Sequence, residues 1–577
     1  MFVSALQDFA AESPAAASLA VVLLVASLLY YLVRRPQRLN FPVVELGDDL
    51  GFDRALDEGF SKYPDTPFVL PTTPPQLILP HACVNEVKSL PENKVSFMKE
   101  VQHMFTCKVT GIGGESHEIL SAVKIDLTRH LASVLDGLQD ETRYAINSEF
   151  GPCEDWTPQP VYFKLTRIVA LLSGRVFVGR PLSRDEAWLK ATINYTWACI
   201  QASDACKRYS PYLRNFIGPY LKEVKNLKKH RQDGADLLQP LLDDLLQKES
   251  EKIGQDGFDD EQGTFCSWVL KYTNEKERAS ALNLANAQMS LSFAAIHTSS
   301  MALSQVVYDL AARPEYIKGL REEIKEVLTE DGYDIDGEGF TKLKKSSYTK
   351  LRKLDSFLKE SQRLSPPGIT SMQRVTTAPV TLSTGHTIPA NTRFAFASQA
   401  IHRSPRTTTF SPEYNPASYA PPSVFDGLRF YKLREMPGKE NRHQFVTTAP
   451  DSLSFGHGIH ACPGRFFASN EIKVVLIELL RNWDVRLKGD TKRMGGDRPP
   501  SFIKGNSCVP NMEAVLEFRK LGVEECVCIY MRPPPIPAQA PRAASPICDQ
   551  RGFNGIPHVS NNLHPKVRRA MPDTKIK

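Results

Sequence analysis

The stretch SFGHGIHACPGRFFA, residues 454–468, is the most informative part of the chain. Cys462 lies in its middle and is followed by a proline and an apolar, helix-like run. Three glycines surround the cysteine: Gly456, Gly458 and Gly464. Glycine permits tight turns and lets the backbone approach a flat group closely. Backbone amides in such a loop and at a helix N-terminus stabilise a thiolate, so the pattern indicates an anionic, metal-binding cysteine.

Two other interpretations of this loop stay open. His457, His460 and Cys462 are possible zinc ligands, but a structural zinc site takes four ligands and no fourth candidate has the usual spacing. A buried structural cysteine would leave the glycines and the neighbouring Phe455 unexplained. The other members of the 11 cysteines are scattered without a CxxC pair, which is typical of reduced thiols in a cytosol-facing domain.

The hydrophobic pattern predicts a mainly α fold with small β regions. The 577 residues are 42% hydrophobic, and the net charge of +6 does not call for a nucleic-acid partner, so none is expected. Helices are predicted over 116–150, 163–178, 281–312, 350–364 and 466–483. Segment 281–312 is apolar around most of its circumference and should be buried. A polar segment, 225–261, predicts an exposed helix or loop, and 379–397 predicts a β-hairpin.

The two ends of the chain differ from this globular region. The apolar run AAASLAVVLLVASLLYYLV at 15–33 is long enough for a transmembrane helix. Three basic residues follow it: Arg34, Arg35 and Arg38. Because basic residues favour the cytosolic side, 1–14 is expected to be a luminal stub and 34–59 a linker. A cleaved signal peptide would need its basic flank before the run, where this chain has acidic residues. The proline-rich and basic segment 521–577 predicts a disordered tail, which leaves 60–520 as the globular domain.

The ten residues FGHGIHACPG resemble the haem-binding loop of cytochrome P450, whose pattern is Phe-x-x-Gly-x-(Arg/His)-x-Cys-x-Gly. Here the pattern falls on Phe455, Gly458, His460, Cys462 and Gly464. The resemblance implies the cytochrome P450 fold and a haem b cofactor held by these residues. It also implies that the Cys462 thiolate is the axial ligand of the haem iron.

Further motifs occur in the order that the family has them. KESQRL supplies Glu360 and Arg363, and FDGLRF supplies Arg429. The resemblance implies that these three form a buried structural network, in which two arginines surround one carboxylate.

The family's contacts with the haem propionates are matched only in part. MQRV contains Arg374, which falls where the family has one such contact. The early helical region has no Trp-x-x-x-Arg motif, so the second contact stays unassigned, with Arg129 and His130 as weak candidates.

SFAAIHTSS, residues 292–300, resembles the part of a helix that crosses the distal haem face. Two alanines would leave room for dioxygen, and Thr298 is the expected catalytic hydroxyl. His297 replaces the acid or amide that is usual in the family. It is either a second catalytic group that delivers protons or a core histidine that is hydrogen-bonded inside the protein.

The resemblance implies a monooxygenase that inserts one atom of dioxygen into an apolar substrate. No flavin-binding segment follows the haem domain, so electrons are expected from NADPH through a separate cytochrome P450 reductase, with cytochrome b5 as a further candidate partner. The chain is especially similar to fungal secondary-metabolism members, which implies a terpenoid or other polycyclic substrate. With the anchor, this predicts a single-pass protein of the endoplasmic reticulum membrane, in contact with the lipid bilayer. The alternatives are a haem-thiolate isomerase or dehydratase that needs no reductase, and a non-catalytic haem- or lipid-binding membrane protein.

Overall fold

The computed structural model describes residues 39–47, 51–114, 116–252, 263–335, 341–407 and 420–522, and six positions between 15 and 25. Those six positions are helical and exposed. Otherwise the expected anchor at 15–33 and nearly all of the expected tail lie outside the described residues. Within the described residues, no helix combines the length and the apolar character needed to cross a bilayer.

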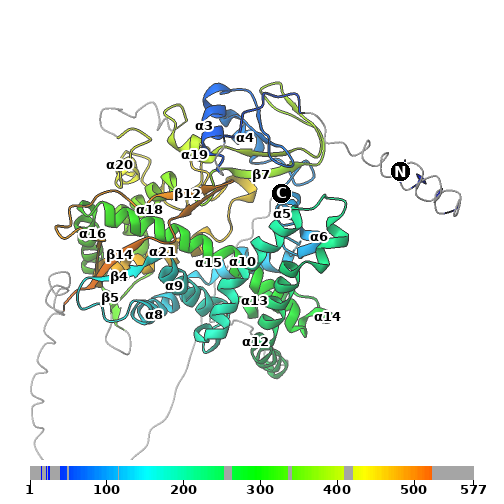
Figure 1. The fold of residues 1–577 in the computed structure, drawn as a ribbon. Helices are drawn as coiled ribbons and strands as arrows, with labels where there is room; N and C mark the ends of the chain where they lie inside the picture. The colour runs from blue at the N-terminus through cyan, green and yellow to red at the C-terminus, as the bar shows by residue number, and fades with distance from the viewer. Residues whose placement is uncertain are drawn as a thin grey trace, which may run out of the picture. The chain divides into compact units, whose positions relative to one another are not determined.

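Helices dominate the described chain (Figure 1). The longer helices are α3 (Asp53–Lys62), α5 (Phe97–Met104), α8 (Leu131–Phe150), α9 (Val161–Phe177), α10 (Glu186–Lys207), α12 (Lys222–Lys252), α13 (Phe265–Tyr272), α15 (Ala281–Ala312), α16 (Glu315–Asp331), α18 (Arg352–Leu364) and α21 (Arg465–Asn482). The shorter ones are α4 (Val84–Val87), α6 (Cys107–Thr110), α7 (His117–Ser121), α11 (Arg214–Ile217), α14 (Glu275–Arg278), α17 (Ser347–Lys350), α19 (Ser398–Arg403) and α20 (Arg429–Arg434). Single-turn 3₁₀ helices occur at η1 (His81–Cys83), η3 (Leu182–Arg184), η4 (Gly218–Tyr220) and η6 (Gly458–His460), and η2 (Ala122–Leu127) is a π-helix.

The β structure is divided among small sheets. The largest has five strands in the order β1 (Phe68–Leu70), β2 (Gln76–Ile78), β10 (Arg393–Phe396), β7 (Ser371–Thr376) and β3 (Val95–Ser96). A three-stranded sheet joins β11 (Trp483–Leu487), β14 (Val515–Lys520) and β4 (Thr157–Pro160). Three antiparallel pairs complete the β structure of the described residues: β5 (Tyr333–Ile335) with β6 (Thr341–Leu343), β8 (Val380–Thr381) with β9 (Thr387–Ile388), and β12 (Ser501–Lys504) with β13 (Ser507–Pro510).

Helix α15 is the centre of the helical region, and it packs on α9, α10, α12, α18 and α21. It begins where the Ser280 side chain accepts a hydrogen bond from the Asn283 amide, and it ends just before Pro314. Because no glycine or proline interrupts its 32 residues, the helix runs unbroken through the core. Most of its side chains are buried, as the apolar circumference predicted.

Three expectations about the elements need correction. The predicted helix at 116–150 is divided into α7, η2 and α8, with the π-helical turns in the middle. The segment 34–59, expected as a linker, contributes to the folded domain, since Val44 and Leu56 are 3% and 2% exposed and α3 begins at Asp53. Its few apolar residues are spaced among polar ones, so composition alone did not mark it as core. In the predicted hairpin at 379–397, β8 pairs with β9, whereas β10 leaves to join the five-stranded sheet.

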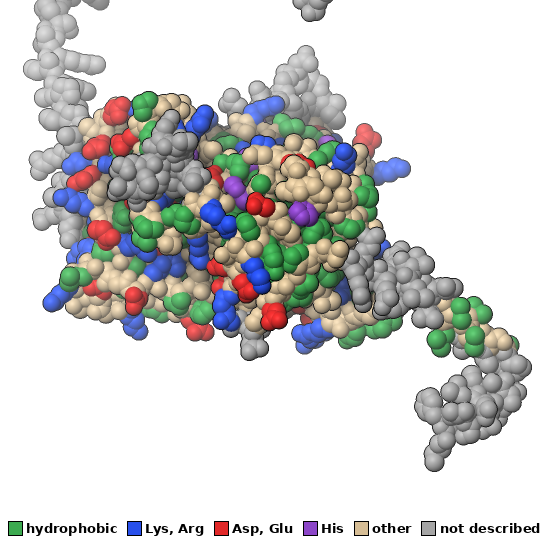
Figure 2. Space-filling model, turned by 90° about the horizontal axis from the view of Figure 1, so that it is seen from above, with side chains coloured by type: hydrophobic (Ala, Val, Ile, Leu, Met, Phe, Trp, Pro, Cys, Tyr) green, Lys and Arg blue, Asp and Glu red, His purple; other side chains and the backbone are tan. Residues whose placement is uncertain are grey.

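One face of the molecule is shown in Figure 2. Lysine and arginine side chains are mixed there with aspartate and glutamate, and apolar side chains lie between them. Charges of both signs close together produce little long-range field, so this face offers no strong electrostatic steering of a charged partner.

Candidate functional site

Cys462 lies between η6 and α21, in a loop whose backbone is fixed by hydrogen bonds. Its amide donates to the Phe455 carbonyl (2.8 Å), and Arg465 Nη1 donates to the Cys462 carbonyl (2.9 Å). Burial raises the pKa of the Cys462 thiol, while the amides of Gly464 and Arg465 and the Arg465 charge partly offset that effect. The side chain is still partly exposed. A thiolate here needs a positive partner on its open side, and a haem iron supplies one.

Position 458 must be a glycine because the backbone of another segment lies directly against it. It has φ of +80°, and a Cβ at this position would collide with the Lys88 carbonyl. The neighbouring Ile459 amide donates to the same carbonyl (3.2 Å). The glycine therefore lets the loop rest on residue 88. Gly464, in contrast, has φ of −82° and open space around it.

The other aromatic and histidine side chains of the loop have protein partners. The ring of Phe455 packs edge-on against Phe445, with centroids 5.4 Å apart. His457 Nδ1 is 3.0 Å from the Thr448 hydroxyl. Within the described residues there is no group of three His, Cys, Asp or Glu side chains placed to hold a metal ion. The zinc interpretation of the loop therefore gains no support.

Three basic side chains gather beside this loop and leave a place for an anion. Arg374 on β7 is buried, and its pKa falls to about 10 because of desolvation. No carboxylate of the described residues lies within ion-pair distance of it. His460 Nε2 is 3.1 Å from Glu92 Oε2, without hydrogen-bond geometry, and its pKa is lowered by burial, by Arg374 and by Lys124. The charges of Glu92 and Glu100 raise the pKa of Arg374, but neither carboxylate forms an ion pair with it, so the cluster can accept the acidic groups of a haem.

Lys124 is a further basic side chain near the loop, which the sequence did not single out. Arg129 is exposed, and His130 stacks on Trp268 with ring centroids 5.6 Å apart. Lys124 lies in the π-helix η2 and is close enough to His460 to affect its pKa. A π-turn shifts the direction of the side chains that follow it, so helical spacing did not reveal this residue.

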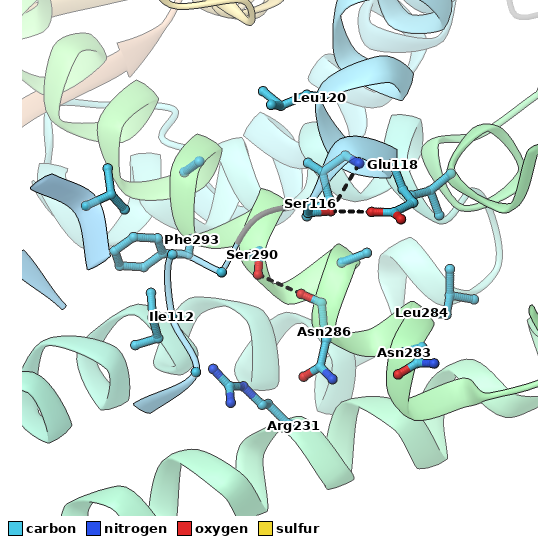
Figure 3. Close-up of a pocket in the computed structure, with 18 of the residues that line it drawn as sticks. Ile112, Ser116, Glu118, Leu120, Arg231, Asn283, Leu284, Asn286, Ser290 and Phe293 are labelled. Carbon is cyan, nitrogen blue, oxygen red and sulfur yellow. Dashed lines mark hydrogen bonds between the residues drawn. The ribbon is translucent and has the colours of Figure 1, made fainter. Parts of the chain in front are cut away.

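A hollow opens along α15. Ala294 and Thr298 are exposed although most of the helix is buried, and they share a face because they are four residues apart. The Thr298 hydroxyl donates to the Ala294 carbonyl (2.7 Å), so its oxygen lone pairs can accept a hydrogen bond from the open side. A cavity of about 880 Å³ reaches Ala294 and extends along α15 toward Asn283 (Figure 3).

His297 points away from this hollow. The Tyr162 hydroxyl is 3.0 Å from its Nδ1, and its Nε2 is 3.0 Å from the Ile193 carbonyl. Because a carbonyl can only accept, Nε2 carries the proton and Nδ1 accepts from Tyr162. Burial lowers the pKa of the ring, and Trp197 packs against it edge-on. These contacts with α9 and α10 favour the core histidine over the proton donor.

The structure brings Glu360, Arg363 and Arg429 together in the core. Arg363 donates to both oxygens of Glu360 at 2.8 Å, and Arg429 Nε lies 3.1 and 3.2 Å from the same two oxygens. Both arginines also donate to backbone carbonyls, including those of His402 and Ala420. The network therefore joins α18 to α19, to α20 and to the segment that precedes α20.

Glu471 is a buried acid that the sequence did not single out. It lies on α21, is 0% exposed, and accepts a hydrogen bond from Ser173 of α9 (2.6 Å). Ser299, the residue after Thr298, is close enough to lower the pKa of Glu471 in part. Burial raises the pKa of Glu471 from 4.5 to about 7. One glutamate on a helix gives no sequence signal, because burial alone distinguishes it from surface glutamates.

Glu471 should make the stability depend on pH. Its folded-state pKa lies above the unfolded value, so its stabilising effect is complete below pH 4.5 and is lost as the pH rises through 7. The loss amounts to about 3 kcal/mol. The free energy of unfolding, measured with urea at pH 5 and pH 8, should decrease between these pH values in the parent. In Glu471→Gln the part of this decrease that Glu471 causes should be absent. Glu478→Gln, a partly exposed position on the same helix, should leave it unchanged, and equal pH dependence in all three proteins would contradict the assignment.

Known proteins resemble this chain over most of its length. The family model for cytochrome P450 matches residues 157–507. Cytochrome P450 monooxygenase ascG of Acremonium egyptiacum is 49% identical over 525 residues, which are 90% of this chain and 98% of the relative. Cytochrome P450 monooxygenase BOA7 of Botryotinia fuckeliana is 40% identical, over 85% of this chain and 91% of the relative. Cytochrome P450 monooxygenase 3 of Gibberella fujikuroi is also 40% identical, over 84% and 90%. The chain therefore belongs to the cytochrome P450 family of haem-thiolate monooxygenases, whose iron receives electrons indirectly from a reductase.

Proposed function

We propose that this protein inserts one oxygen atom of dioxygen into an apolar secondary metabolite, and that the Cys462 thiolate would hold the iron of haem b. The observation that carries the proposal is the pairing of two features. A cysteine sulfur with an open side is supported by loop amides, and a cavity reaches Ala294, which is one turn before the exposed Thr298 on the same face of α15. The haem, when bound, supplies the activation of dioxygen.

The residues of this chain then have separate tasks. Arg374, His460 and Lys124 would hold the acidic groups of the haem through charge-assisted hydrogen bonds. Ala294 leaves space on the helix, and Thr298 accepts and passes protons at its hydroxyl oxygen. The Glu360 network keeps α18, α19 and the segment before α20 in place.

The role of Thr298 provides the test of the proposal. Thr298→Ala removes the hydroxyl but leaves Cys462 untouched, so CO and substrate binding should persist. Proton delivery typically contributes about 10²–10⁴-fold, so the product formed per NADPH consumed should fall by at least about tenfold while hydrogen peroxide is released. The measurement is product, peroxide and NADPH in a reaction reconstituted with the reductase.

Two variants control for damage to the helix. Ser300→Ala removes a hydroxyl that also donates to the carbonyl four residues earlier, but Ser300 is fully buried, so coupling should be unchanged. His297→Ala should lower thermal stability, since Tyr162 loses a partner, and should likewise preserve coupling. Unchanged coupling in Thr298→Ala would exclude the proton-delivery role of Thr298. No NADPH-dependent product from any variant or from the parent would contradict the monooxygenase proposal.

The cavity supports an apolar substrate. Phe97, Val101, Phe105, Leu120 and Phe293 contribute to its lining. Terpenoids and related polycyclic products have the size and apolar surface for such a space. NADPH–cytochrome P450 reductase, with cytochrome b5 as a second donor, would supply the electrons.

Membrane attachment is the remaining part of the proposal, at the endoplasmic reticulum with the catalytic domain in the cytosol. The apolar run at 15–33 is the proposed anchor. A second support is an exposed aromatic segment between α10 and α12, which we call the 209–220 patch. Its side chains Tyr209, Tyr212, Leu213, Phe216 and Tyr220 are 38%, 40%, 50%, 75% and 77% exposed. Large apolar side chains gathered at a surface favour contact with a membrane.

Deleting residues 1–33 should therefore weaken binding to phosphatidylcholine–phosphatidylserine vesicles without removing haem. Phe216→Asp with Tyr220→Asp should weaken the remaining binding further, because charged side chains resist entering the apolar layer. Phe502→Asp, an exposed aromatic position on β12, serves as the control. Vesicle co-sedimentation that is equal for the deletion and the full chain would contradict the proposed anchor.

A further inference from the structure

Arg231 of α12 is a cation at the wall of the substrate cavity. Its Nε donates to the Tyr195 hydroxyl (3.0 Å), and its Nη1 would lie 2.9 Å from a Cβ placed at Gly111. In the described part of the chain, no carboxylate comes within ion-pair distance of the guanidinium. Figure 3 shows the guanidinium between Ile112 and Asn286.

The titratable groups around Arg231 do not neutralise it. They are Tyr195, Cys107 and Cys199, whose pKa values the Arg231 charge lowers in part. Burial outweighs that effect in each case: it raises the pKa of Cys199 to about 12 and holds those of Tyr195 and Cys107 above their ordinary values. All three are therefore uncharged at neutral pH, so none of them forms an ion pair with Arg231.

The cavity is polar beside Arg231 and apolar elsewhere. Asn283, Asn286 and Ser290 follow one face of α15 at helical spacing. Two acids also line the cavity, and neither lies within ion-pair distance of Arg231. Glu118 accepts from the Ser116 hydroxyl (3.0 Å), and Glu277 accepts from the Asn274 side-chain amide (2.7 Å).

The packing of α12 on α15 places Arg231 along the cavity. Arg278, just before α15, pairs with Glu249, and a Cβ at Gly234 would collide with Met289. Helices α12 and α15 are therefore antiparallel, and Arg231 lies beside about residues 291–293 of α15. Thr298 is then roughly two helical turns further on, a distance on the order of 10 Å along the axis.

We propose that Arg231 binds an anionic oxygen group, a carboxylate or an ionised phenol, on an otherwise apolar substrate. Such a group at Arg231 would place a carbon about 10 Å away beside Thr298. A bidentate, charge-assisted contact fixes orientation as well as affinity, so it would select which carbon is oxidised. This inference rests on the proposed monooxygenase function and names its substrate class.

The test compares matched probes on the full-chain holoprotein by substrate-induced spectral shift and by titration calorimetry. Dodecanoate and dodecan-1-ol differ in charge, as do an alkyl nitrophenol that is ionised at neutral pH and the corresponding neutral alkylphenol. Arg231→Gln should weaken binding of the anionic member of at least one pair by about 10- to 100-fold. The neutral members should change by less than about threefold. Whichever pair responds identifies the carboxylate or the phenolate as the recognised group.

Matched variants isolate the effect of the charge at position 231. Lys229→Gln removes the same charge from an exposed position of α12 and should bind all probes like the parent. Arg231→Lys should recover part of the anion preference, and Tyr195→Phe should retain it, because the cation remains. If Arg231→Gln does not fold, added salt should still weaken binding of anions to the parent selectively.

The outcomes separate the two proposals. Equal binding of anionic probes by the parent and Arg231→Gln, or insensitivity of the parent's anion binding to salt, would overturn the role of Arg231. A holoprotein that has a normal CO spectrum but shows no anion preference would refute this inference alone. If the holoprotein lacks the CO band of a thiolate-bound haem, the monooxygenase proposal is contradicted. Titration calorimetry would still decide whether Arg231 binds anions.

Discussion

Cys462→Ser is expected to abolish the far red-shifted ferrous–CO band and the NADPH-dependent activity. A serine hydroxyl is not ionised at neutral pH and donates far less electron density than a thiolate, so a bound haem would lose the thiolate spectrum. Among the described cysteines, Cys462 alone lies in the glycine-rich loop beside the basic cluster of Arg374, His460 and Lys124. The CO difference spectrum and the haem content per chain check this directly.

Cys508→Ser is the matched control. Cys508 is a buried thiol on β13, outside the 454–468 loop, and burial also raises its pKa. It should retain the band. A Cys462→Ser protein that keeps the far red-shifted band would show that another residue is the ligand.

Glu360→Ala should destabilise the folded domain by about 3–5 kcal/mol. The substitution leaves Arg363 and Arg429, which are 5% and 0% exposed, without their shared carboxylate. Whole domains are stable by only about 5–15 kcal/mol, so little folded, haem-loaded protein should accumulate. Haem content and the urea midpoint are the measurements.

Glu322→Ala provides the comparison on the surface of α16. Glu322 is 55% exposed and lies 3.9 Å from Lys318, so its loss should change stability by less than about 1 kcal/mol. If Glu360→Ala matched Glu322→Ala in stability, the network would not be a structural centre.

The sequence predicted features that depend on local spacing. The glycines around Cys462 and the uninterrupted apolar run of α15 can be read without knowing which helices pack together. Glu360 and Arg363 also lie within one helix, so their proximity follows from a spacing of three.

Features that depend on packing could not be predicted in this way. His297 and Thr298 are neighbours in sequence but point to different surroundings, and only the positions of α9 and α10 show that His297 is enclosed. Lys124 depends on a π-turn, and Arg231 belongs to a helix whose polar composition suggested mere exposure. The sequence gives the chemical type of each of these residues, whereas only the packing of the helices gives its surroundings.

The contact between Ile459 and Lys88 has a consequence for sequence divergence. It joins the amide of one residue to the carbonyl of the other, and only Gly458 is constrained by it. Since every residue has a carbonyl, position 88 can exchange its side chain freely while the thiolate loop keeps its support. Among related sequences, residue 458 should therefore tolerate almost no substitution. The surface around residue 88 can change, and so acquire new partners, without moving Cys462.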